Sequence, residues 1–251
     1  MRLLELVAPV FGARCCLLVG EDGTCVAVDV GAGVADRVAE VVGAQGWRPA
    51  AVLATHGHAD HTWGAGPLAA AWDVPVVLHA ADAHRLADPF GTLGPLGRAA
   101  HDPTGPLGQA LAAAGLAPGA YVAPTRVEPF GDAADARTPD VVLAWGGVRL
   151  VARHAPGHTE GATLYLVEVA TDGPAGPGGR RAVALTGDVL FAGSVGRTDL
   201  PGGDDARMRT TLAEVVATLP PETLVVPGHG PTSTVAAELA ANPYLAPYRQ
   251  A

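Results

Sequence analysis

Thr55-His56-Gly57-His58-Ala59-Asp60-His61 places three imidazoles and one carboxylate within a single short stretch of the chain. In a helix these side chains would not share one face, whereas in a loop they can converge on one point. Nitrogen and carboxylate ligands of this kind suit zinc, and also iron or manganese. Clustered histidines at a buried strand end would repel one another once protonated. We therefore predict a metal site here and not a solvated histidine-rich loop.

The sequence pattern around this stretch, a strand followed by a small residue and a metal ligand, recurs along the chain. The apolar run Ala50–Ala54 comes first and is typical of a buried strand. Three later segments repeat the pattern of a strand, a small residue and a metal ligand. Because strand ends that open on one edge form a natural site rim, we predict one site from all of them. Its predicted members are His56, His58, Asp60, His61, His158, Asp188 and His229.

The remaining pattern predicts an α/β (α+β) fold of two packed sheets with helices outside. Strands are expected at Cys15–Val19, Thr24–Val28, Ala50–Ala54, Val74–Leu78, Val141–Ala144, Val148–Ala152, Thr163–Val169, Ala182–Thr186 and Thr223–Val226. Helices are expected at Val34–Ala44, Pro67–Trp72, Ala80–Ala87, Asp204–Thr218 with Asp204 as N-cap, and Thr234–Ala241. Residues 88–140 are rich in proline and glycine, so we expect a lid-like excursion with one short helix near Gln109–Ala114. Thr171–Arg181 is expected to be a solvated loop.

The composition excludes several classes of protein. The length of 251 residues suits a single domain over 1–251, and the net charge of −9 argues against a nucleic-acid partner. The chain has no lysine, which excludes a lysine nucleophile. No apolar run approaches the roughly 18 residues of a membrane span. Without a signal-peptide pattern near Met1, we expect a cytoplasmic protein with reduced cysteines that acts on a small molecule.

The His-x-His-x-Asp-His motif at 56–61, followed in order by His158, Asp188 and His229, resembles the metallo-β-lactamase superfamily. This resemblance implies a four-layer αββα sandwich and two divalent metal ions, zinc by default. It assigns His56, His58 and His158 to the first ion and Asp60, His61 and His229 to the second, with Asp188 bridging both. It also implies hydrolysis through a metal-bound hydroxide, with Asp60 as the catalytic carboxylate.

A narrower similarity concerns the segment Gly187–Asp204, which resembles glyoxalase II-like (hydroxyacylglutathione hydrolase-like) thioesterases. Pro227–Pro231 and Asn242–Leu245 are also similar to that group. The resemblance implies S-acyl (2-hydroxyacyl) thiols as the substrate class. Arg197 and Asp199 are expected to form a structural ion pair. Only Arg249 stands in the tail, so the glutathione-binding cations of that group are not visible, and Arg98, Arg126 or Arg137 are the alternatives.

Three other functions stay open on the sequence. A persulfide dioxygenase would use one iron held by a subset such as His56, His158 and Asp188. A lactonase or β-lactamase-like hydrolase would use the full set of ligands. A non-catalytic binding protein would be inert and free of metal. Metal content and turnover of thioesters, lactones and persulfides distinguish these functions.

Overall fold

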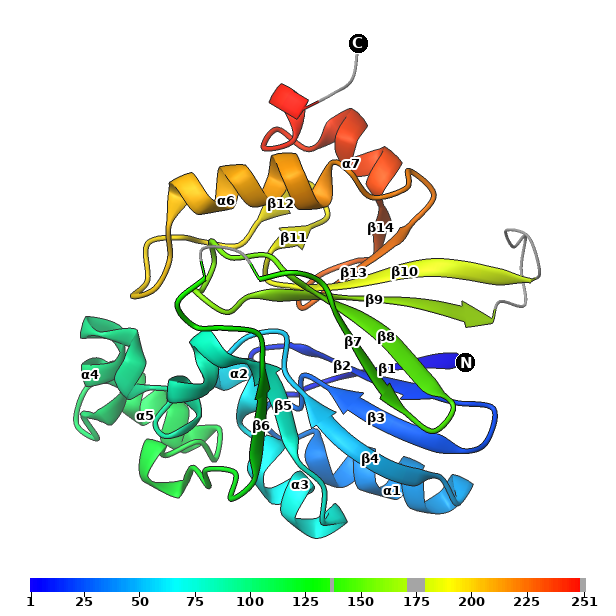
Figure 1. The fold of residues 1–251 in the computed structure, drawn as a ribbon. Helices are drawn as coiled ribbons and strands as arrows, with labels where there is room; N and C mark the ends of the chain where they lie inside the picture. The colour runs from blue at the N-terminus through cyan, green and yellow to red at the C-terminus, as the bar shows by residue number, and fades with distance from the viewer. Residues whose placement is uncertain (136–137, 171–178, 249–251) are drawn as a thin grey trace.

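The computed structural model describes residues 1–135, 138–170 and 179–248, and two six-stranded sheets dominate it (Figure 1). The first sheet contains, in spatial order, β1 (Arg2–Val7), β2 (Arg14–Val19), β3 (Thr24–Val28), β4 (Arg48–Leu53), β5 (Val76–His79) and β6 (Val127–Phe130). The second contains β14 (Ser233–Thr234), β13 (Leu224–Pro227), β10 (Arg180–Gly187), β9 (Thr163–Ala170), β8 (Val148–His154) and β7 (Val141–Trp145). A short hairpin, β11 (Leu190–Phe191) and β12 (Ser194–Val195), follows β10.

Strand direction brings the predicted site together. In the first sheet β3, β4, β5 and β6 run parallel to one another. In the second sheet β10 and β13 are parallel, and β8 runs the same way because both β8 and β10 pair antiparallel with β9. The carboxyl ends of these strands therefore meet at a shared edge within each sheet, where the loops that follow them can converge.

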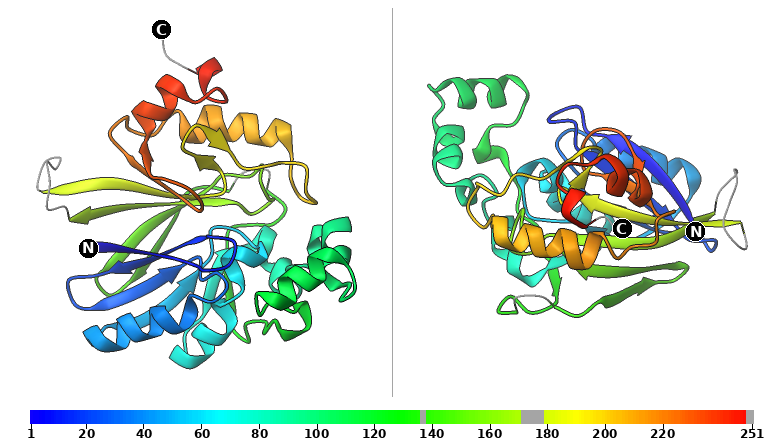
Figure 2. Two further views of the ribbon diagram at one scale, coloured as in Figure 1. Left: turned by 180° about the vertical axis from the view of Figure 1, so that it is seen from behind. Right: turned by 90° about the horizontal axis from the view of Figure 1, so that it is seen from above.

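Helices cover the outer faces of both sheets, which gives the four layers of an αββα sandwich (Figures 1 and 2). The first sheet is covered by α1 (Ala35–Gln45) and α3 (Ala65–Trp72). The second is covered by α6 (Asp205–Thr211), its π-helical continuation Leu212–Val216, and α7 (Val235–Ala241). Asp204 accepts hydrogen bonds from the amides of Ala206 and Arg207, so the predicted N-cap is confirmed.

Three apolar layers hold the sandwich together. Between the sheets, alternating strand residues such as Leu53, Tyr165 and Leu185 are buried in one cluster. Separate clusters fill the space between each sheet and its helices. The predicted fold is therefore confirmed, and its large apolar content is explained by burial on both faces of each sheet.

The excursion predicted over 88–140 contains the short helix expected near Gln109–Ala114, and a second helix that was not predicted. It contains two helices, α4 (Pro95–His101) and α5 (Pro106–Ala113), together with 3₁₀ turns at Gly91–Leu93 and Pro118–Ala120. The prediction is also wrong about its extent, because β6 adds Val127–Phe130 to the first sheet beside β5. We call residues 88–121 the cap; it projects to one side of the sandwich (Figure 2).

Smaller differences concern the ends of elements. The helix predicted at Ala80–Ala87 is present as a 3₁₀ helix, η1 (Ala80–Leu86). Of the loop predicted at Thr171–Arg181, residues 171–178 lie outside the described part of the chain, whereas Arg180 and Arg181 belong to β10. The three cysteines are buried and unpaired, as expected. Within the described residues, no helix is long and apolar enough to cross a bilayer.

Candidate metal centre

The seven predicted ligands lie at the shared strand edge. The loop after β4, which continues into the short helix α2 (Ala59–Thr62), supplies the motif residues 56–61. The loops after β8, β10 and β13 supply His158, Asp188 and His229. Their side chains form two groups of possible metal donors, whose members are His56, His58 and His158 in one, and Asp60, His61, Asp188 and His229 in the other. In each group the donor atoms all lie within 4.8 Å of one another.

The first group is a buried cluster of three imidazoles. The Nε2 atom of His56 lies 3.2 Å from Nδ1 of His58, and Nε2 of His158 lies 2.9 Å from the same Nδ1. Burial lowers the pKa of His56 well below its usual value and lowers that of His58 to about 3, so both rings are neutral near pH 7. Neutral imidazoles whose nitrogens converge in this way are suited to bind a divalent cation.

The second group contains two carboxylates beside two imidazoles. Nε2 of His229 lies 3.1 Å from a carboxylate oxygen of Asp60, and Nε2 of His61 lies 3.3 Å from Oδ1 of Asp188. Burial raises the pKa of Asp60, but the positive charge of His61 and the hydrogen bond from His229 outweigh it and lower that pKa. Burial alone would lower the pKa of His61, yet the surrounding carboxylates raise it well above its usual value. This part of the site therefore favours positive charge.

Asp188 lies between the two groups. Its Oδ1 is near His61 and His229, at 3.3 and 3.8 Å, and its Oδ2 is 3.7 Å from Nε2 of His158. Oδ1 is buried, and no described residue gives it a hydrogen bond. A buried carboxylate oxygen without a donor is costly unless a cation satisfies it. The donor set thus fits two divalent ions with Asp188 within reach of both.

Hydrogen bonds to the far side of the rings fix which nitrogen faces the centre. Nδ1 of His61 lies 3.0 Å from Asp29, and Nδ1 of His158 lies 2.8 Å from the carbonyl oxygen of Arg197. Thr55 donates its hydroxyl proton to Asp29, leaving an oxygen lone pair 3.2 Å from Nδ1 of His56. Each of these three Nδ1–H groups therefore donates, so that Nε2 of each ring faces the centre. On His61 a bound metal would take the place of the Nε2 proton.

A buried ion-pair network joins the two loops of the first group. Asp82, fully buried in η1, accepts hydrogen bonds from the amides of Gly57 and Gly161 and from the hydroxyl of Thr159. Arg85, also buried, contacts Asp82 and donates to Glu160. The motif loop and the His158 loop are thereby held to the same carboxylate. Sequence reasoning did not identify Asp29 or Asp82; an aspartate at the end of β3 was a signal for Asp29, and no local signal marked Asp82.

The loop that resembles thioesterases supports the centre through its backbone. Arg197 and Asp199 form the predicted ion pair, with Nε of Arg197 2.7 Å from the carboxylate of Asp199, and both side chains are exposed. The carbonyl of Arg197 accepts from His158, as described above. Of the cations considered for binding glutathione, Arg126 is paired with Glu128, Arg98 is exposed on α4, and Arg137 and Arg249 lie outside the described residues.

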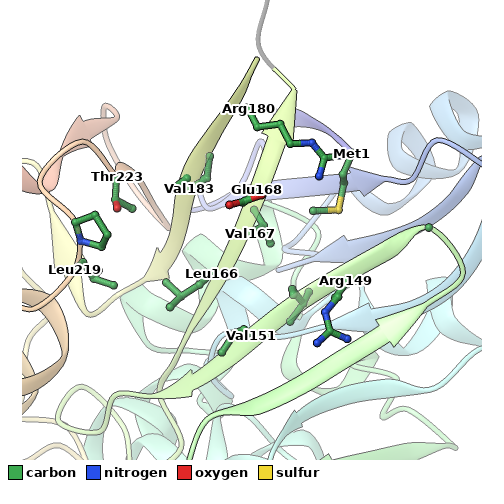
Figure 3. Close-up of a pocket in the computed structure, with 14 residues that line it drawn as sticks. Met1, Arg149, Val151, Leu166, Val167, Glu168, Arg180, Val183, Leu219 and Thr223 are labelled. Carbon is green, nitrogen blue, oxygen red and sulfur yellow. The ribbon is translucent and has the colours of Figure 1, made fainter. Parts of the chain in front are cut away.

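Two cavities differ in their relation to this centre. A cavity of about 310 Å³ borders four of the donors and is lined on its other side mostly by the cap. A second cavity, of about 400 Å³, is lined by residues of β8, β9 and β10 and of the segment before β13, including Arg149, Glu168 and Thr223 (Figure 3). None of the seven donors lines the second cavity, so the first is the cavity that belongs to the candidate centre.

An αββα sandwich with His and Asp donors at its shared strand edge defines a metallo-hydrolase. The comparison with protein families agrees, because the model of the metallo-beta-lactamase superfamily matches residues 10–171. The chain belongs to the metallo-β-lactamase superfamily.

Curated relatives extend this membership over almost the whole chain. An uncharacterized protein of Mycobacterium tuberculosis is 32% identical over 98% of this chain and 98% of its own length. YqgX of Bacillus subtilis, a probable metallo-hydrolase, is 32% identical over 89% of this chain and 88% of its own. The hydroxyacylglutathione hydrolase GloC of Haemophilus influenzae is 32% identical over 41% of this chain and 44% of its own.

Solved structures show the same architecture. BLEG-1, a B3 metallo-beta-lactamase, superposes with a TM-score of 0.70 at 25% identity, over 97% of this chain and 99% of its own. TTHA1623, solved in a di-iron-bound form, superposes with a TM-score of 0.68 at 29% identity, over 96% of this chain and 100% of its own.

Proposed function

We propose that this protein is a thioester hydrolase of the glyoxalase II type, which acts on S-acyl thiols including 2-hydroxyacyl thiols. The position of Asp188 between two groups of donors carries the hydrolytic part of the proposal. The segment Gly187–Asp204 and the partial similarity to GloC support a thioester as substrate.

The residues divide between two ions as the superfamily pattern implies. His56, His58 and His158 would hold one ion, and Asp60, His61 and His229 the other, with Asp188 shared. Zinc is the first candidate for this nitrogen and oxygen set, and iron and manganese fit the same donors. The di-iron form of TTHA1623 supports testing iron alongside zinc. When bound, such ions acidify a water molecule and polarise a carbonyl group.

Asp60 is the residue that we assign to proton transfer. Its side chain is partly exposed, 26%, so a water molecule can reach it, and its depressed pKa keeps it ionised. As the water oxygen bonds to the acyl carbon, Asp60 accepts the water proton. When the carbon–sulfur bond breaks, that proton passes to the departing thiolate. The products are a carboxylic acid and a free thiol.

The first experiment measures metal content and thioester turnover of the purified protein and of Asp60→Ala. Because general-base catalysis contributes about 10²–10⁴-fold, we expect kcat to fall by that factor at least. His84→Ala is the matched control, since His84 is an exposed imidazole outside the two groups. An Asp60→Ala variant that retains its metal and full activity would contradict the assignment.

The same preparation distinguishes the rival functions. If the protein contained a single iron per chain and consumed oxygen with persulfides, it would be a persulfide dioxygenase and not a thioesterase. Turnover of lactones or β-lactams without turnover of thioesters would identify another hydrolase of the superfamily. A protein that binds no metal and turns over none of these substrates would be a binding protein.

A further inference from the structure

The cavity of about 310 Å³ beside the donors has two chemically different ends. One end is formed by His58, Asp60, His158 and Asp188 of the candidate centre. The other end is apolar and comes mostly from the cap. The side chains that line this apolar end of the cavity are Phe11, Phe90, Leu93, Leu96, Ala100, Leu107, Leu111 and Leu200. Apart from Arg197, the polar side chains that line the cavity are thus those of the candidate centre, where a bond would be cleaved.

The apolar end is not fully closed by the protein itself. Phe90, Leu93 and Ala100 are buried in a cluster of their own, separate from the three layers of the sandwich. Phe11 and Leu96, at the same cavity, are 49% and 41% exposed. Large apolar side chains that stay exposed around a concavity are characteristic of a ligand site.

Charge argues against a polar occupant of this end. Arg197 is the one cation among the described residues that line the cavity, and its guanidinium is bound to Asp199. A thiol carrier with several carboxylates therefore finds no free cation inside. A short lactoyl group would fill only the polar end and would leave the leucines without a partner.

We propose that the cavity binds the hydrocarbon chain of the substrate, so that the substrate class is a medium-chain acyl thioester. This inference rests on the proposed function and specifies its acyl group. A cavity of about 150 Å³ accommodates benzene, so one of about 310 Å³ has room for roughly six to ten carbons. The acyl carbon lies at the donors, and the chain extends along the apolar side chains that α4 and α5 contribute to the cavity.

The direct test is a series of N-acetylcysteamine thioesters with acetyl, lactoyl, butanoyl, hexanoyl, octanoyl and decanoyl groups. Transfer of one methylene group from water to an apolar site strengthens binding about fourfold. We therefore expect kcat/KM to rise by about that factor per methylene until the cavity is filled. A second readout does not require catalysis. Calorimetry with the carboxylates from acetate to decanoate should show affinity that rises with chain length and a negative heat-capacity change.

Two variants locate the effect in the cavity. Ala100→Leu adds volume at the apolar end and should lower kcat/KM for the octanoyl ester by at least about tenfold, with little change for the acetyl ester. Leu96→Ser, at the exposed rim, keeps the buried packing and should weaken octanoate binding several-fold. Val122→Ser is the control, because Val122 is 54% exposed and does not line the cavity. Melting temperatures of all three report whether they fold.

The outcomes separate this inference from the proposed function. Hydrolysis of thioesters with rates and carboxylate affinities independent of chain length would overturn the inference and leave the thioesterase in place. Carboxylate affinity that rises with chain length, without hydrolysis of any thioester, would overturn the thioesterase and support the apolar acyl site. A Leu96→Ser variant that binds octanoate as tightly as the natural chain would also count against the inference.

Discussion

We call the strand edge that carries the seven candidate donors the metal edge. It lies beside the cap, but different physical interactions hold the two regions together. At the metal edge, every donor follows a buried strand, and carboxylates such as Asp29 and Asp82 bind several backbone and side-chain donors at once. The cap consists of short helices that contact the sandwich through apolar and aromatic side chains, with Trp63 5.6 Å from Tyr121 between ring centres. Directional bonds fix positions closely, whereas apolar contacts mainly exclude water.

This difference suggests that the two regions have separate roles in catalysis and in substrate selection. The metal edge determines the reaction, because the ligands must be held within a few tenths of an ångström. The cap determines which molecule is accepted, because it forms the far wall of the cavity. Variants of the first region should therefore change metal affinity, and variants of the second should change substrate preference without changing metal affinity.

The largest effect within this comparison is expected for Asp82→Asn. Both oxygens of Asp82 accept hydrogen bonds, so the amide of asparagine would face an N–H donor and leave Arg85 poorly compensated. We expect a loss of about 3–5 kcal/mol in unfolding free energy, and metal affinity about 10–100-fold weaker. Denaturant titration measures the free energy of unfolding, and competition with a chelator measures the metal affinity. Asp36→Asn, an exposed acid in the first turn of α1, is the control.

An Asp82→Asn variant with unchanged metal affinity would show that the loops hold their positions without the shared carboxylate. The metal edge would then tolerate substitutions as well as the cap does.

The site residues could be predicted where a short stretch of sequence identifies them. The motif 56–61 and the later strand ends each carry their candidate ligands within a few residues. The sequence therefore predicted all seven side chains that the structure brings together as possible metal donors. Asp82 was not identified, because its bond to Thr159 spans 77 residues and depends on the packing of both sheets. In the fold, alternating strands and amphipathic helices were recognisable for the same local reason.

The cap was the least predictable region. Helix α5 corresponds to the short helix predicted near Gln109–Ala114, whereas α4 was not predicted. Both helices begin with proline, a favourable start, but weak periodicity and frequent glycine obscured α4. The strand β6 is only four residues long, and its pairing partner β5 lies some fifty residues earlier in the chain. Short elements of this kind gain their stability from tertiary contacts, which no local pattern reveals.

A smaller effect is expected for Thr55→Val, which removes one hydroxyl and keeps the side-chain shape. Nδ1 of His56 would lose its acceptor, and the bond from the hydroxyl to Asp29 would be lost as well. We expect about 1–3 kcal/mol less stability and metal affinity weaker by about tenfold. Thr223→Val is a matched control, because Thr223 is buried and its hydroxyl makes no hydrogen bond to a described residue. Equal metal affinity in both variants would contradict the role of Thr55 in orienting His56.

The smallest effect is expected in the cap, for Tyr121→Phe. The hydroxyl of Tyr121 donates to the carbonyl of Leu86 at 3.1 Å, so its loss should cost about 0.5–1.5 kcal/mol and leave metal affinity unchanged. Burial raises the pKa of Tyr121 to about 12, so the tyrosine contributes its stability below about pH 10 and loses it as the pH rises toward 12. The stability difference between the two proteins should therefore narrow over that interval, as denaturant titrations at several pH values would show. If Tyr121→Phe weakened metal binding, the cap would be coupled to the metal edge, and the separation of reaction from substrate preference would not hold.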